Sequence, residues 1–187
     1  MATVPRSTRW TAEMVRALPN DGNRYEVIDG ELFVTPAPSW EHQSASKQLF
    51  RLLDRYLSVH AIGDVIYAPA DVEFDNERMV EPDLFAVPLI DGRVPRTWEE
   101  VRRLLLAVEI LSPGTARADR QVKRRLYQRQ DVPEYWIVDV DARLIERWRP
   151  EDTRPEILDQ ELTWQPDPAQ PPLVSDLARY FADVLGE

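Results

Sequence analysis

Residues 104–111 read Leu-Leu-Leu-Ala-Val-Glu-Ile-Leu, an apolar run that is typical of a buried strand except for one carboxylate, Glu109. An unpaired carboxylate in an apolar interior is very costly, so such a residue is normally paired, protonated or bound to a metal. A second acid, Asp83, opens a similar run at residues 83–87, directly after Pro82. The sequence therefore predicts two strands that each deliver one acid.

The helix expected after this strand, at residues 115–130, supplies a lysine. At about 100° per residue, five side chains lie on or beside its buried stripe: Asp119, Val122, Lys123, Leu126 and Tyr127. Three arginines are expected on the opposite, solvent-facing side: Arg117, Arg120 and Arg124. Lys123 is therefore the basic residue that faces the sheet, where an ammonium beside two carboxylates would form a compensated charge cluster. Its alternative role is an i,i+4 ion pair with Asp119 on an exposed face.

Length and composition limit the class of protein. The chain has 187 residues, 43% of them hydrophobic, which suits one globular domain. It has no cysteine, which excludes disulfides, thiolate catalysis and cysteine-bound zinc. No apolar run approaches the ~20 residues of a membrane span, and residues 1–10 lack the apolar stretch of a signal peptide. We therefore expect a cytoplasmic protein without a membrane partner.

The charge distribution is uneven. A net charge of -10 argues against a general nucleic-acid coat protein, because phosphate binding rests largely on lysine and arginine. Residues 116–129 are the exception, with six basic side chains and one acid. This segment is either a solvated helix surface or one basic face on an acidic protein.

The expected elements alternate between helices and strands. In chain order they are a helix capped by Thr11 at residues 11–18, a hairpin of strands at 24–28 and 31–35, a long helix capped by Ser39 at 39–60, strands at 64–68, 71–74, 83–87 and 104–111, a helix at 115–130, a hairpin of strands at 134–140 and 143–148, and a final helix at 175–185. Asp29-Gly30 is the strongest hairpin signal. Residues 150–172 contain six prolines and should form loops with at most short strands.

Several motifs occur together in a fixed order. They are residues 25–32 (YEVIDGEL), residues 35–39 followed by His42, Pro82-Asp83, residues 109–113 (EILSP), Asp119 with Lys123 and Tyr127, and residues 132–139 (VPEYWIVD). This combination resembles the Uma-two family of restriction-endonuclease-like proteins over about residues 10–185. The resemblance implies the PD-(D/E)XK nuclease superfold, an α/β (α+β) fold with a mixed β-sheet flanked by helices and an N-terminal β-hairpin. We expect a single domain over residues 1–187, with a core at about 24–149 and a C-terminal loop and helix at 150–187.

The same resemblance implies a set of site residues. Asp83 and Glu109 would be the metal ligands, together with the backbone carbonyl of Ile110, and Mg²⁺ or Mn²⁺ would be the ion. The superfold usually has a lysine two residues after the second acid, where this chain has Leu111. The family pattern moves the catalytic lysine onto the following helix, at Lys123. Four further residues are secondary candidates: Glu41, His42, Asp119 and Tyr127.

Three functions are compatible with these residues. The first is metal-dependent hydrolysis of phosphodiester bonds in DNA, in which a homodimer would present two sites to the two strands of a duplex. The second is a nuclease-fold binding or scaffold protein that no longer cuts, which the acidic composition favours. The third is a two-carboxylate glycosidase, but no aromatic-rich cleft pattern supports it. Each acid and Lys123 also has a purely structural alternative as a member of an ion pair.

Overall fold

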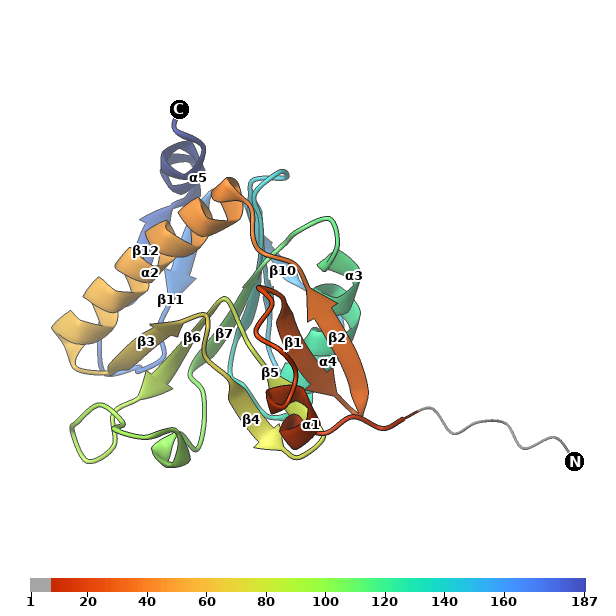
Figure 1. Cartoon of the computed structure of the whole chain (residues 1–187). Helices are drawn as coiled ribbons and strands as arrows, with labels where there is room; N and C mark the ends of the chain where they lie inside the picture. Colours follow the sequence, from red (N-terminus) through yellow and green to blue (C-terminus); the bar gives the residue numbers. More distant parts are fainter. Residues whose placement is uncertain (1–7) are drawn as a thin grey trace, which may run out of the picture. The chain divides into compact units, whose positions relative to one another are not determined.

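The computed structural model describes residues 8–187, and these residues divide into two compact units (Figure 1). The chain up to Ala37 and the segment Asp71–Glu81 form one, here called the hairpin unit. Pro38–Ala70 and Pro82–Glu187 form the other, the sheet unit. The expected lack of a signal peptide concerns residues that lie mostly outside the described part. Within residues 8–187, no helix has the length and apolar character needed to cross a membrane.

From residue 8 onward, the hairpin unit contains one short helix and four strands. They are α1 (Ala12–Arg16), β1 (Arg24–Ile28), β2 (Glu31–Thr35), β4 (Val72–Asp75) and β5 (Arg78–Val80), with the strands in the order β2-β1-β5-β4. The β1–β2 hairpin has the predicted limits, and its turn residues Asp29 and Gly30 have φ of 54° and 82°. Both values lie in the left-handed region, which aspartate and glycine tolerate better than most residues.

The sheet unit is built on six strands in the order β10-β9-β8-β7-β6-β3. Their limits are β3 (Gly63–Tyr67), β6 (Leu84–Pro88), β7 (Leu106–Ile110), β8 (Tyr135–Asp139), β9 (Leu144–Trp148) and β10 (Glu156–Leu158). Only the β7–β8 pair is parallel among these neighbours. The helix between β7 and β8 supplies the crossover that a parallel pair needs. A short turn of helix, η1 (Trp98–Glu100), lies in the β6–β7 connection.

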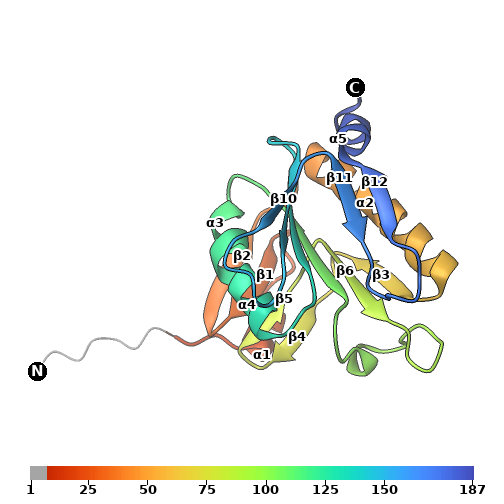
Figure 2. The same ribbon diagram turned by 180° about the vertical axis from the view of Figure 1, so that it is seen from behind.

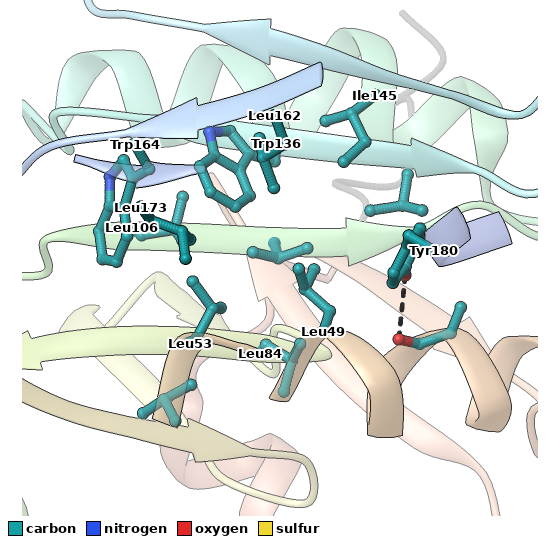
Figure 3. Close-up of a cluster of buried hydrophobic side chains, with 14 of the residues drawn as sticks. Leu49, Leu53, Leu84, Leu106, Trp136, Ile145, Leu162, Trp164, Leu173 and Tyr180 are labelled. Carbon is teal, nitrogen blue, oxygen red and sulfur yellow. Dashed lines mark hydrogen bonds between the residues drawn. The ribbon is translucent and has the colours of Figure 1, made fainter. Parts of the chain in front are cut away.

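One face of this sheet carries the main hydrophobic core. It is covered by α2 (Trp40–His60), by α5 (Leu177–Leu185), and by the hairpin of β11 (Glu161–Trp164) and β12 (Leu173–Asp176). Figure 3 shows Leu49 and Leu53 of α2 directed toward Leu84 and Leu106 of the sheet, with Trp136 alongside. The Tyr180 hydroxyl fastens α5 to α2 by donating to the carbonyl of Ala45 at 3.0 Å.

The opposite face is covered by one helical segment, Ala116 to Arg129 (Figures 1 and 2). It starts as α3 (Ala116–Ala118), passes through a π-helical turn, η2 (Asp119–Lys123), and continues as α4 (Arg124–Arg129). A π-turn inserted in an α-helix is rare and is frequently found at functional sites. The predicted helix at 115–130 is therefore present, but its middle turn is not α-helical.

The N-terminus of α2 gives a first test of the fold. The Ser39 hydroxyl accepts a hydrogen bond from the backbone N–H of His42, as expected for an N-cap. We expect Ser39→Ala to lower the free energy of unfolding by about 1 kcal/mol, because one N–H group at the helix end loses its side-chain acceptor. Urea denaturation of the variant and the parent measures this loss. Ser58→Ala, near the exposed end of the same helix, is the control, and an equal loss there would contradict the capping role.

Candidate functional site

The two acids from the β6 and β7 region lie on the same face of the sheet. Leu84 pairs with Val108 in the antiparallel β6–β7 ladder, so Asp83 and Glu109 are the next directly opposed positions. Leu84 and Val108 point into the main core, and side chains alternate along a strand, so both acids point to the opposite face, which the segment from Ala116 to Arg129 covers. Asp83 and Glu109 are only 3% and 2% exposed.

Asp83 is oriented by two donors. Its Oδ2 accepts a 2.7 Å hydrogen bond from the backbone N–H of Ile110 and lies 3.0 Å from Nε2 of His42. The N–H and C=O of one strand residue point to the same side of the strand, so the Ile110 carbonyl is also directed toward the side on which Asp83 lies. Of the secondary candidates, His42 is thus brought to the group, from the first turn of α2.

Glu109 is held by two residues of the covering helix. Its Oε1 lies 3.0 Å from Nζ of Lys123 and accepts a hydrogen bond from the Tyr127 hydroxyl at 3.2 Å. Nζ of Lys123 is also 3.7 Å from Oδ1 of Asp119. All four side chains are buried, so the Asp119–Lys123 pair is not the exposed surface pair considered as an alternative. The structure therefore brings Lys123, Asp119 and Tyr127 together with Glu109.

The side chain of Tyr135, on β8, contacts two members of this group, Asp119 and Tyr127. Burial raises the pKa of its phenol well above the ordinary value, and the charges of Asp119 and Glu109 raise this pKa further. The phenol therefore stays protonated, and its hydroxyl donates to the backbone carbonyl of Asp119 at 3.2 Å. Its ring also packs against Tyr127, with 4.7 Å between centroids. Tyr135 lies in the strand expected at residues 134–140, and no sequence pattern indicated this contact.

A comparison with protein families identifies the chain. The family model "Uma2: Putative restriction endonuclease" matches residues 12–178, almost the whole length. The chain belongs to the Uma2 family. A crystal structure described as a "putative nuclease belonging to DUF820 from Anabaena variabilis ATCC 29413" shares this fold, with a TM-score of 0.72 and 17% identity over 93% of this chain and 98% of that one. A search of curated proteins finds no match. The predicted family and its nuclease-type fold are thus confirmed.

The remaining secondary candidate, Glu41, is exposed and is not buried with this group. Glu41 is exposed in the first turn of α2, where its own backbone N–H and then the Ser39 hydroxyl lower its pKa. A carboxylate at this position also suits the positive end of the helix dipole. The structure therefore explains Glu41 as a helix-end residue.

The donor atoms of this Uma2 chain suit a hard divalent cation. Within residues 8–187 no group of three or more acidic, histidine or cysteine side chains is arranged to hold a metal. Mg²⁺ does not need one, because it commonly takes one or two carboxylates and completes its shell with waters and substrate phosphates. The buried group contains the three carboxylates of Asp83, Glu109 and Asp119 and the single ammonium of Lys123. With a neutral His42, its formal charge is about two negative units, which a divalent ion would balance.

Arg120 departs from its predicted place. The sequence pattern put it on the solvent side of the helix, but its side chain lies 3.0 Å from Asp139 on β8 and 2.6 Å from Glu146 on β9. The extra residue in the π-turn changes the direction of the side chains within it, so a constant 100° step misplaces this arginine. Arg120 thus ties the covering helix to the sheet.

Proposed function

We propose that this protein is a metal-dependent nuclease that hydrolyses phosphodiester bonds in DNA. In this proposal Asp83, Glu109 and the Ile110 carbonyl hold Mg²⁺ or Mn²⁺, and Lys123 is the catalytic lysine. The single observation that carries it is the buried arrangement of two opposed acids with the ammonium of Lys123 on Oε1 of Glu109. Such an arrangement is common at functional sites.

The residues divide the chemistry between them. Hydrolysis joins the oxygen of a water to phosphorus, breaks one ester P–O bond, and delivers a proton to the leaving oxygen. A divalent cation held by the two acids would stabilise the charge of the scissile phosphate and activate the water. Lys123 would orient the water or donate to a phosphate oxygen. The hydrogen bonds on Asp83 Oδ2 and Glu109 Oε1 fix the directions of both carboxylates in advance.

A cleavage assay on the purified chain tests the proposal. Supercoiled plasmid DNA should be nicked or linearised in the presence of Mg²⁺ or Mn²⁺, unchanged with excess chelator, and cut again when the metal is restored in excess. Activity that continues in chelator would indicate another mechanism. Absence of turnover on both DNA and RNA, with either metal, would overturn the nuclease proposal.

A second candidate is a nuclease-fold protein that binds without cutting. It is favoured by the burial of the group, because Asp83, Glu109 and Lys123 are each no more than 3% exposed. Gel-shift measurements beside the cleavage assay separate the two candidates. Binding of intact DNA with no product in either metal supports the second, and product formation supports the first.

A further inference from the structure

We propose that Asp119 is a positioning residue, which uses the π-turn η2 to hold the ammonium of Lys123 on Glu109. The role rests on the proposed function, because it concerns the same reaction. In this role Asp119 would act through Lys123. The contacts that carry it are the 3.7 Å separation of Asp119 Oδ1 from Lys123 Nζ and the 3.0 Å separation of Nζ from Glu109 Oε1.

The π-turn aligns three side chains along the helix. In a regular α-helix, each four-residue step overshoots a full turn by about 40°, so Asp119, Lys123 and Tyr127 would spread over about 80°. A π-turn has more residues per turn, so the step from Asp119 to Lys123 loses this overshoot. All three side chains are accordingly buried, at 1%, 3% and 0% exposure. Val122, expected to mark the buried stripe, is only half-buried.

The turn is also anchored from the sheet. The hydroxyl of Tyr135 donates to the main-chain carbonyl of Asp119, where the π-turn begins. This bond fixes the backbone that carries the Asp119 carboxylate. Lys123 therefore lies between one carboxylate on β7 and one on its own helix. A contact with Glu109 alone would set only the distance between its carboxylate and the ammonium. The contact with Asp119 also sets the direction in which the Lys123 side chain points.

The composition of the chain allows a direct test, because it has only two lysines, Lys47 and Lys123. Lys47 is exposed on α2 and serves as the internal reference. With an amine-acylating reagent and peptide mass spectrometry, the parent should label at Lys47 and be protected at Lys123. In Asp119→Asn, the labelling rate of Lys123 should rise toward that of Lys47. Gln121→Ala, an exposed change in the same turn, should leave Lys123 protected.

Steady-state cleavage supplies the second readout. Asp119→Asn should lower kcat by about 10- to 100-fold, as for other residues that orient a catalytic group. The KM for DNA should change by less than about twofold, since substrate contacts are unaltered. Asp119→Glu, which keeps the charge, should keep Lys123 protected and recover part of kcat. Thermal melts of each variant show that the fold is intact.

The outcomes separate this inference from the nuclease proposal. If Asp119→Asn leaves both the protection of Lys123 and kcat unchanged, the positioning role is overturned while the nuclease proposal stands. If the parent does not cut nucleic acid, the nuclease proposal fails, and labelling alone decides whether Asp119 holds Lys123. If Asp119→Asn does not fold, loss of protection in Asp119→Glu overturns the role, and retained protection supports it.

Discussion

Replacing Asp83 or Glu109 by alanine should lower metal-dependent DNA cleavage by at least about 10³-fold, because charge stabilisation by a bound cation contributes several kcal/mol to the transition state. Each variant removes one of the two carboxylates that would hold the ion, and no other acid replaces it at the same position of the ladder. The measurement is kcat/KM on plasmid or oligonucleotide DNA with saturating Mg²⁺ or Mn²⁺.

Two further variants make this result specific. Asp83→Asn keeps an oxygen that can accept the N–H of Ile110, so it tests the charge of Asp83 apart from its hydrogen bond. Glu41→Ala removes an exposed acid from the same unit and should cut at the parental rate. If Asp83→Ala or Glu109→Ala retains full activity while folding normally, these acids are not the metal ligands.

Lys123→Met should lower the free energy of unfolding by about 3–5 kcal/mol in metal-free buffer, the usual cost of removing one partner from a buried ion pair. The ammonium lies within 3.0 Å of Glu109 and 3.7 Å of Asp119. Its loss leaves their carboxylates facing one another in a site from which water is largely excluded. Urea denaturation gives the difference directly. Adding Mg²⁺ or Mn²⁺ should restore part of it, since a cation then faces the same acids.

Glu109→Gln is the matched opposite change. It removes one negative charge from a group that has three carboxylates and one ammonium, and it keeps an oxygen for the Tyr127 hydroxyl. The metal-free protein should therefore be as stable as the parent or more stable, and stabilisation by added metal should disappear. A loss of several kcal/mol for Glu109→Gln, with no metal response in the parent, would identify a structural ion pair instead.

The sequence predicted the elements whose signals are local. Thr11 and Ser39 both cap the helices they were expected to cap. In each case the side-chain oxygen accepts a hydrogen bond from a backbone N–H of the first helical turn, which has no partner within the helix. The β1–β2 hairpin follows from Asp29-Gly30, which tolerates the backbone of a tight turn. Two short apolar runs that each carry one acid predicted that Asp83 and Glu109 would come from neighbouring strands, and the β6–β7 register places them opposite one another.

Other features needed the folded chain. The strand β5 has three residues, Arg78–Val80, too few to show any alternation in sequence. The π-turn depends on which carbonyl each N–H reaches, and no residue type specifies that choice. His42 was a secondary candidate from the sequence, but its contact with Asp83 joins residues far apart in the chain, and the packing of α2 brings the two side chains together. In the proline-rich tail, the apolar residues Leu162 and Trp164 alternate with polar ones. This alternation is typical of a strand, and both residues lie in β11.

The burial of the two acids and the lysine means that the chain can contain a complete site that solvent and ligands do not reach. In the described form, Asp83, Glu109 and Lys123 are each no more than 3% exposed, so the substrate phosphate of the proposed reaction would reach them only in conformers that expose them. Apparent affinity falls in proportion to the competent population, so a protein that is open about 1% of the time binds about 100-fold more weakly than its open form. Under the proposed nuclease function, the level of activity would be set by a conformational equilibrium as much as by the chemistry of the site.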